Sequence, residues 1–264
     1  MEKVRSKLKK FFRKIKGEDR PMNVVGHLTE LRNRVAVVLV IFLVAVITCY
    51  VFTDEILDYC LQIGSSFSFI YISPSELVMA YVRISVVCGI VVVIPVILYE
   101  IWAFMRPALT KTERRYGFLA LLGGTVFFAL GAYFAFRLMI PFMIQFFTTF
   151  DTRGEVAASI TVENYIGFLL TTAVTFGAIF EMPVAAMLLS SLGLVKAEYL
   201  RKFRKYAVLI VFIVAAVITP PDVVSQILIA LPMLGLYELS TWICRFIEKR
   251  KARKEAAEEK QSAG

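Results

Sequence analysis

The sequence predicts an all-α integral membrane protein with six transmembrane helices and both termini in the cytoplasm. Three observations lead to this prediction. Apolar residues make up 58% of the 264 residues and charged residues only 19%, whereas a globular domain has about 45–50% and about 25%. The apolar residues are gathered into six runs, and the basic residues alternate between the connections that join these runs.

Four of the runs have transmembrane length. A helix of about 20 apolar residues crosses ~30 Å of hydrocarbon and pairs its own backbone groups. The alternation of polar and apolar residues that is typical of a membrane barrel strand is missing. Each run carries at most one charge, which is Glu100 in the second and Glu181 in the fourth. The four runs are residues 35–52, 84–105, 116–136 and 164–194.

Two shorter runs, 206–218 and 223–237, are joined by Thr219-Pro220-Pro221-Asp222. Two adjacent prolines break a helix, so the sequence predicts a hairpin of short fifth and sixth helices. As a helix, the first of these runs covers only ~20 Å, about 10 Å less than the hydrocarbon thickness. Two re-entrant segments are the alternative that this shortness leaves open.

The distribution of lysine and arginine predicts the orientation. Cytoplasmic connections carry an excess of these residues. The successive connections carry 11 (residues 1–34), none (53–76), four (105–116), two (137–162), five (193–206) and seven (245–264). Alternate connections therefore carry nearly all of the basic residues, which places both termini on the cytoplasmic side of the cytoplasmic (inner) membrane. This pattern also explains the net charge of +9 without nucleic acid as a partner.

The distribution of charged residues also divides the sequence into three segments. They are a basic cytoplasmic extension (residues 1–21), a transmembrane domain (22–250) and a charged cytoplasmic tail (251–264). We expect no cleavable signal peptide, because the first 20 residues contain no apolar core. The extension has two open interpretations: a helix on an anionic membrane surface, or a solvated basic tail. The apolar residues at helical spacing in it are Val4, Leu8, Phe11, Phe12 and Ile15.

Motifs for bond-changing chemistry are missing from the sequence. There is no phosphate-binding GxxxxGK[ST], no HExxH and no GxSxG. One histidine and four cysteines without a CxxC make a metal site or a structural disulfide improbable. We therefore expect neither an enzyme nor a cofactor. An intramembrane enzyme that uses Ser190 or Ser191 with Lys196 is the weaker alternative.

Glu181 is the most unusual residue of the apolar runs. It lies ~27 Å from Glu163 and ~20 Å from Leu194 along a helix, deep in the bilayer. A carboxylate at this depth indicates a functional site, although a protonated core glutamate is the alternative. A proton-coupled transporter that uses Glu181 is a rival function. Three prolines are expected to break the second, fourth and sixth helices, with plain kinks in a helix bundle as the alternative: Pro95, Pro183 and Pro232.

Two further carboxylates lie in basic surroundings, before the first run and between the second and third. They are Glu30 in His27-Leu28-Thr29-Glu30-Leu31-Arg32 and Glu113 in Lys111-Thr112-Glu113-Arg114-Arg115. Local ion pairing, for example between Glu30 and Arg34 at i,i+4, is sufficient to explain them.

A series of motifs along residues 22–250 resembles the TatC family of twin-arginine protein translocase subunits. They are His27-Leu28-Thr29-Glu30-Leu31-Arg32, Pro95-Val96-Ile97-Leu98-Tyr99, Trp102-Ala103-Phe104, Pro107-Ala108-Leu109 with Glu113-Arg114-Arg115, Phe180-Glu181-Met182-Pro183, Thr219-Pro220-Pro221-Asp222 and Ser225-Gln226. This resemblance implies a glove-shaped bundle. Its implied function is a receptor for folded precursor proteins that bear Arg-Arg signal peptides, driven by the proton-motive force.

The resemblance also implies site residues. Glu30 and Glu113 match the carboxylates that bind the paired arginines, because a guanidinium fits a carboxylate bidentately. Leu31, Pro95 and Phe104 match positions near that site. Glu100 departs from the family, in which a glutamine is common there.

The resemblance implies partners as well. Glu181 matches a position that contacts the single-span subunits TatA and TatB, in an oligomeric complex surrounded by membrane lipids. Asp222 and Gln226 match positions near the outer turn, where helix capping is the alternative role.

Overall fold

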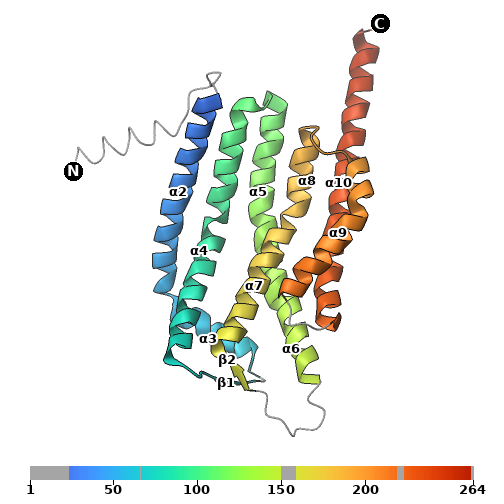
Figure 1. Ribbon diagram of the computed structural model, residues 1–264. Coiled ribbons are helices and arrows are strands. Elements are labelled where there is room, and N and C mark those ends of the chain that lie inside the picture. The colour runs from blue at the N-terminus through green and yellow to red at the C-terminus, as the bar shows by residue number, and fades with distance from the viewer. Residues whose placement is uncertain (1–23, 66, 150–158, 219–222, 263–264) are drawn as a thin grey trace, which may run out of the picture.

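The structure is a computed structural model that describes residues 24–65, 67–149, 159–218 and 223–262. The helices of its main bundle stand side by side (Figure 1). They are α2 (Val24–Tyr50), α4 (Pro74–Met105), α5 (Lys111–Phe134), α7 (Val162–Phe180), α8 (Met182–Ser191), α9 (Ala197–Ile218) and α10 (Val223–Ser262). The shorter elements are α3 (Thr53–Ile63), η1 (Arg106–Ala108), the π-helical η2 (Ala135–Met139), α6 (Ile140–Thr149) and the strands β1 (Ser68–Ile70) and β2 (Ser159–Thr161).

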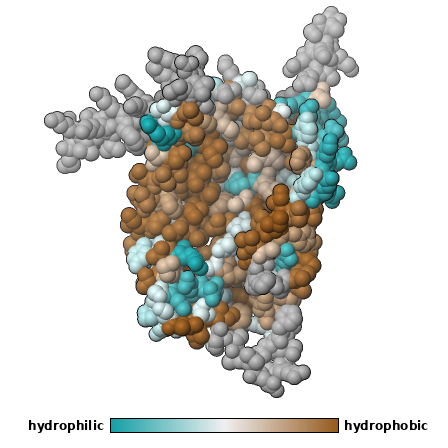
Figure 2. Space-filling view, viewed as in Figure 1, coloured by the Kyte–Doolittle hydropathy of each residue, from teal (hydrophilic) through white to brown (hydrophobic). Residues whose placement is uncertain are grey.

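Five helical segments of the described residues are long and apolar enough to cross a membrane. They are Leu28–Tyr50, Pro74–Met105, Gly117–Thr148, Val162–Ser191 and Val223–Arg253. Large apolar side chains cover much of the visible surface between the two ends, and hydrophilic residues gather toward those ends (Figure 2). This surface suits contact with lipid rather than water. The mostly helical membrane architecture is therefore confirmed, and a sixth crossing by α9 stays a prediction.

Several helices are longer than the apolar runs that predict them. The third helix continues through η2 and α6 to Thr149, so the expected connection at 137–162 is wrong over its first half. α9 has 22 residues and α10 has 40, so both helices are longer than the short runs expected there. The apolar part of α9 stays short, since α9 is not among the five segments above. Polar and charged residues extend a helix as well as apolar ones do, because all are adequate helix formers. α10 also passes through residue 250, where charge alone suggested the start of a tail.

Only one of the three prolines that were expected to break helices does so. α4 continues through Pro95 and α10 through Pro232, so the expected breaks there are wrong. A membrane helix that continues leaves only the groups next to the proline to be paired, whereas a full break exposes several. Pro183 stands in the first turn of α8, where the backbone needs no donor. The fourth apolar run is thus divided between α7 and α8 at Glu181.

The end of the molecule opposite the two termini contains elements that the sequence did not predict (Figure 1). β1 and β2 pair in parallel, with Ser68 opposite Ser159 and Ile70 opposite Thr161. α3 buries Leu57 and Cys60, and the hydroxyl of Tyr165 donates to the carbonyl of Cys60 at 3.0 Å. All four cysteines are free, and burial raises the pKa of the Cys60 thiol to about 12.

The apolar core has two main parts, and α7 belongs to both. One part joins α7 to α3 and α4 around Ile84, Ile166 and Leu169. The other joins α7 to α9 and α10 around Phe176 and Ile229. α7 also approaches α5 closely, because neither helix has a side chain at Gly131 and Gly177. A Cβ at Gly131 would lie 2.5 Å from the carbonyl oxygen of Phe176.

Candidate functional site

The candidate arginine-binding residues gather at one end of the molecule. Glu30 lies in the first turns of α2, Phe104 in the last turn of α4, and Glu113 in the first turn of α5. These three helix ends lie at the same end of the bundle (Figure 1). The backbone thus brings the two carboxylate-bearing segments to one side of the predicted membrane. The side chain of Glu113 lies outside the described part of the chain.

Arg34 of α2 connects α2 to α4 at this end of the bundle. Its guanidinium donates to Oε1 of Glu30 at 3.0 and 2.5 Å, to Oε2 of Glu100 at 2.7 Å, and to the carbonyl oxygen of Ala103 at 3.3 Å. The ion pair at i,i+4 that the sequence suggested is therefore confirmed. The second pair, with Glu100, joins α2 to α4 and was not predicted. Glu100 is only 7% exposed, so it serves as a buried counter-ion of Arg34.

Glu30 is only partly satisfied by Arg34. Its Oε1 accepts from Arg34, while its Oε2 is enclosed and has no hydrogen-bond partner among the described residues. A carboxylate has room for about four donors, and a buried acceptor without a donor is costly. The side chain of Glu30 is 15% exposed. The site therefore holds one acceptor that a further donor would stabilise.

The apolar candidates are spread along α2 and α4. Leu31 follows Glu30 and is 41% exposed, whereas Phe104 is half-buried. Pro95 is exposed on α4, nine residues before Phe104, which corresponds to ~13 Å along the helix. Leu31 and Phe104 therefore lie near the Arg34 cluster, whereas Pro95 lies more than two turns away from it.

Glu181 lies at the junction of α7 and α8. Its backbone N–H donates to Ala178 at 3.2 Å, and its carbonyl accepts from Ala185 at 2.8 Å. The carboxylate points at Gly124 of α5, where a Cβ would lie 2.7 Å from Oε2 and 2.9 Å from Cδ1 of Leu98. Oε1 is buried and has no partner in the described part of the chain. A donor is thus missing at this intramembrane carboxylate too.

Comparison with known proteins identifies the family. The family model described as "Sec-independent protein translocase protein (TatC)" matches residues 26–232. This chain belongs to the TatC family. It is 34% identical to the translocase protein TatCd of Bacillus subtilis over 89% of this chain and 96% of the relative. It is 39% identical to TatC of Helicobacter pylori (strain J99) over 84% of this chain and 88% of the relative.

A solved structure agrees with these relatives. A crystal structure of the twin-arginine translocase receptor TatC superposes with a TM-score of 0.77 at 34% identity, over 84% of this chain and 99% of that chain. The resemblance seen in the motifs is confirmed. The protein is a membrane component of the Sec-independent protein translocase, a receptor family and not an enzyme family. The alternative of a serine-based enzyme is excluded by the family, and the Ser191 hydroxyl donates to the Leu188 carbonyl at 2.7 Å, as at many helix ends.

Of the two TatC motif positions near the Pro-Pro turn, the structure describes one, Gln226. The amide of Gln226 donates to the carbonyl oxygen of Phe212 at 2.9 Å and so ties α10 to α9. This bond gives Gln226 a structural role within the hairpin. Asp222 lies outside the described residues.

Trp102 is a TatC motif residue for which the sequence analysis predicted no role. Its ring lies against Gly117 of α5, where an added Cβ would lie 2.7 Å from Cδ1 of Trp102. The ring centroids of Trp102 and Phe118 are 6.0 Å apart. The guanidinium of Arg106 lies 5.5 Å from the Trp102 ring, as in a cation–π pair. Trp102 therefore packs the end of α4 onto the start of α5. The Trp-Ala-Phe motif is the sequence signal for it.

Gly124→Ala is expected to destabilise the protein by about 1–2 kcal/mol, because the new methyl group displaces the Glu181 carboxylate or Leu98. Thermal unfolding of the purified protein in detergent micelles measures the change. Gly123→Ala is the matched control, since the nearest atom to its Cβ would be 3.9 Å away. The double variant Gly124→Ala/Glu181→Ala should recover stability. Equal unfolding midpoints for Gly124→Ala and Gly123→Ala would contradict this contact.

Proposed function

We propose that this TatC-family protein is the receptor subunit that binds the Arg-Arg signal peptides of folded precursor proteins. Its cytoplasmic face recognises the peptide and nucleates the translocation site with TatA- and TatB-type single-span subunits. The proton-motive force supplies the energy. The chain crosses the cytoplasmic membrane six times, with both termini inside. This orientation is supported by the basic residues that the structure describes, since most of them lie at one end of the bundle.

The observation that carries the proposal is the state of the Glu30 carboxylate. One oxygen is held by Arg34, and the other is buried without a partner among the described residues. A guanidinium of the signal peptide supplies the missing donor, in the planar geometry that carboxylates accept. Arg34 shows that this end of the bundle already accommodates an arginine between two acids.

Glu113 is the second carboxylate of the proposed site. It lies in the first turn of α5, where a carboxylate is compatible with the positive end of the helix dipole. Two acids on different helices suit two consecutive arginines, and the exposed Leu31 together with Phe104 provides apolar surface beside them. Pro95 contributes at a distance, along the exposed face of α4. A lysine pair is expected to bind less well, since an ammonium lacks the planar fork.

Glu30→Gln and Glu113→Gln are each expected to weaken binding of an Arg-Arg signal peptide about tenfold. A hydrogen bond to a charged partner contributes about 1.5–3 kcal/mol, and 1.4 kcal/mol corresponds to a factor of ten. Fluorescence anisotropy of a labelled peptide with the purified full-length protein in nanodiscs measures the change in Kd.

Glu198→Gln is the charge-matched control, because Glu198 is an exposed acid in the first turn of α9, near the same end of the bundle. Its peptide affinity should remain that of the parent protein. A Lys-Lys peptide should bind the parent weakly and respond little to the two substitutions. Undiminished Arg-Arg binding in both Glu30→Gln and Glu113→Gln would refute the proposed site.

Glu181 is the proposed contact for the single-span subunits, with Asp222 and Gln226 near the outer turn. A polar side chain on a partner helix supplies the donor that Oε1 lacks, because hydrocarbon offers no other. The break between α7 and α8 supports this assignment, since irregular backbone at membrane depth commonly marks a functional position.

A further inference from the structure

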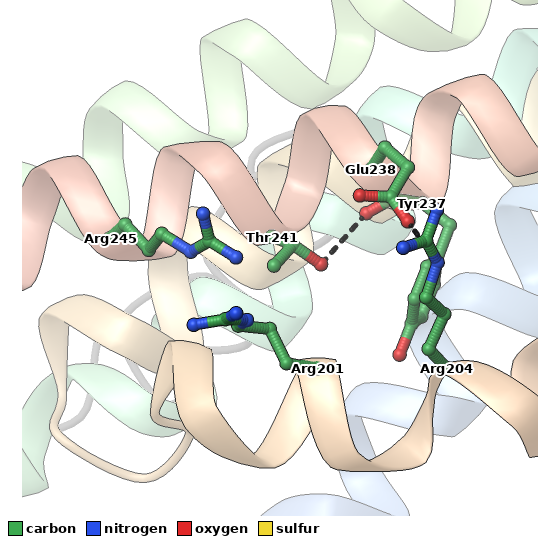
Figure 3. Close-up of a pocket in the computed structure, with 6 residues that line it drawn as sticks. All are labelled: Arg201, Arg204, Tyr237, Glu238, Thr241 and Arg245. Carbon is green, nitrogen blue, oxygen red and sulfur yellow. Dashed lines mark hydrogen bonds and ion pairs between the residues drawn. The ribbon is translucent and has the colours of Figure 1, made fainter.

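A second polar site lies between α9 and α10, away from the proposed peptide site. Arg201 and Arg204 come from α9, and Arg245 comes from α10 (Figure 3). The cavity between these helices has a volume of about 250 Å³, and its lining is completed by Tyr237, Glu238 and Thr241. It lies within the polar half of α9, before the apolar run that begins near Tyr206.

The charges of this cavity do not balance. Glu238, the acid of the lining, pairs with Arg204 at 2.7 Å. Arg201 and Arg245 have no hydrogen-bond or ion-pair partner among the described residues, and both guanidinium groups lie beside the space between the helices (Figure 3). The three arginines and one acid of the lining therefore leave a net charge of about two positive units in the cleft between the facing helices. An anion with several oxygens is the ligand that this arrangement suits.

The neutral lining residues are fixed by their own bonds. The hydroxyl of Tyr237 donates to the carbonyl of Leu200, and the hydroxyl of Thr241 donates to the carbonyl of Tyr237 at 3.1 Å. Tyr237 and Thr241 are both buried. The floor of the cavity is therefore rigid, whereas Arg201 and Arg245 are exposed and free to close on a ligand.

An apolar hollow adjoins this cavity on α10. It has a volume of about 430 Å³ and shares Glu238, Thr241 and Arg245 with the first, adding Leu239 and Trp242. Trp242 is 63% exposed and stacks on Phe246, with ring centroids 6.2 Å apart. Exposed aromatic residues beside arginines are typical of the depth at which lipid headgroups lie. The site therefore combines a charged cavity with an apolar surface that leads toward the bilayer.

We infer that the cleft between α9 and α10 binds an anionic phospholipid of the inner leaflet. Its phosphate lies between Arg201 and Arg245, and its glycerol and upper acyl chain lie on Leu239 and Trp242. Basic cavities between membrane helices on the cytoplasmic side are known to take such headgroups. The bound lipid neutralises the two arginines and fills the cleft. It thereby strengthens the contact between the two helices of the hairpin.

Trp242 provides a direct probe of this site. The chain has two tryptophans, so Trp102→Phe leaves Trp242 as the single fluorophore. The full-length variant is placed in phosphatidylcholine vesicles that contain brominated phosphatidylglycerol or, separately, brominated phosphatidylcholine at the same mole fraction. Bromine quenches tryptophan on contact. We expect phosphatidylglycerol to associate with Trp242 several-fold more strongly than phosphatidylcholine.

The arginine variants decide whether this preference comes from the cleft. Arg201→Gln/Arg245→Gln is expected to abolish it. Lys202→Gln/Arg250→Gln removes the same charge from exposed positions of the same helices and should retain it. Equal quenching by the two lipids, or equal loss of preference in both double variants, would overturn the inference.

Two further arms complete the test. Inorganic phosphate is compared with chloride at equal ionic strength. Because free phosphate competes for the same two arginines, it should weaken the preference only when it is in large excess over the lipid; complete loss of the preference at a phosphate concentration equal to that of the lipid would identify free phosphate as the ligand and overturn the lipid assignment. Native mass spectrometry of the protein with both tryptophans, released from mixed micelles, counts retained phosphatidylglycerol and phosphatidylcholine. The same dependence on Arg201 and Arg245 is expected there, independently of the Trp102→Phe background.

Discussion

Arg34→Gln is expected to destabilise the protein by about 3 kcal/mol, because it leaves one buried and one partly buried acid without their partner. The side chains of Glu100 and Glu30 are only 9% and 15% exposed, so water replaces the guanidinium poorly. Glutamine offers fewer donors than arginine and no charge. α2 packs mainly on α4. The loss of stability should therefore appear first as separation of these two helices.

Two free cysteines report this separation. Cys49 on α2 and Cys88 on α4 are both half-buried, and they react with a thiol-specific dye as the helices part. The midpoint of thermal unfolding in detergent, followed by this reaction, should fall by several degrees in Arg34→Gln. Arg32→Gln is the control, because Arg32 is exposed on the same helix.

A double variant separates the ion pairs from other effects of the substitution. Arg34→Gln/Glu100→Gln removes the most buried acid together with its partner, so it should regain part of the lost stability. An unfolding midpoint of Arg34→Gln equal to that of Arg32→Gln would show that the ion pairs do not hold α2 on α4.

Gly131→Ala is expected to cost about 1–3 kcal/mol, and Gly131→Val more, because α5 and α7 touch there through their backbones. The new Cβ would lie 2.5 Å from the carbonyl oxygen of Phe176 and 2.9 Å from the Cα of Gly177. Backbone atoms do not rotate away as side chains do. The two helices must therefore separate over the part of the core that α7 shares with α9 and α10.

Gly235→Ala is the matched control for this substitution. Gly235 also lies inside a helix, but no atom beyond the backbone of its own helix and its chain neighbours lies within 4 Å of its added Cβ, as far as the structure describes the chain. Alanine should stabilise that helix by up to about 1 kcal/mol. Opposite signs of the two changes in the free energy of unfolding are the expected result. Similar values would mean that the approach of α5 to α7 is not tight.

The apolar spans could be predicted because the hydrocarbon thickness fixes a length that few soluble helices reach. Their ends could not, since a helix continues into polar residues wherever its backbone remains paired. The added lengths of α5–α6, α9 and α10 are of this kind. The effect of each proline also depended on position. Pro183 begins a helix, whereas Pro95 and Pro232 lie within one.

The candidate site could be predicted only where its contacts join residues that are close in sequence. Glu30 with Arg34 follows from helical spacing alone. The contact of Arg34 with Glu100 joins residues 66 positions apart, and no local pattern predicts it. The cleft around Arg201 and Arg245 could not be predicted either, because its arginines belong to two separate basic connections in the sequence. Only the packing of α9 on α10 brings them together.

The 40 residues of α10 make a rod of ~60 Å, about twice the thickness of the hydrocarbon. Its outer part extends beyond the rest of the bundle (Figure 1). The bonds of Tyr237 and Glu238 to α9 lie between the C-terminal part of this rod and its start at Val223. A helix that is unbroken over this length and held at one point couples its two ends, so a displacement of its C-terminal part is transmitted toward Val223.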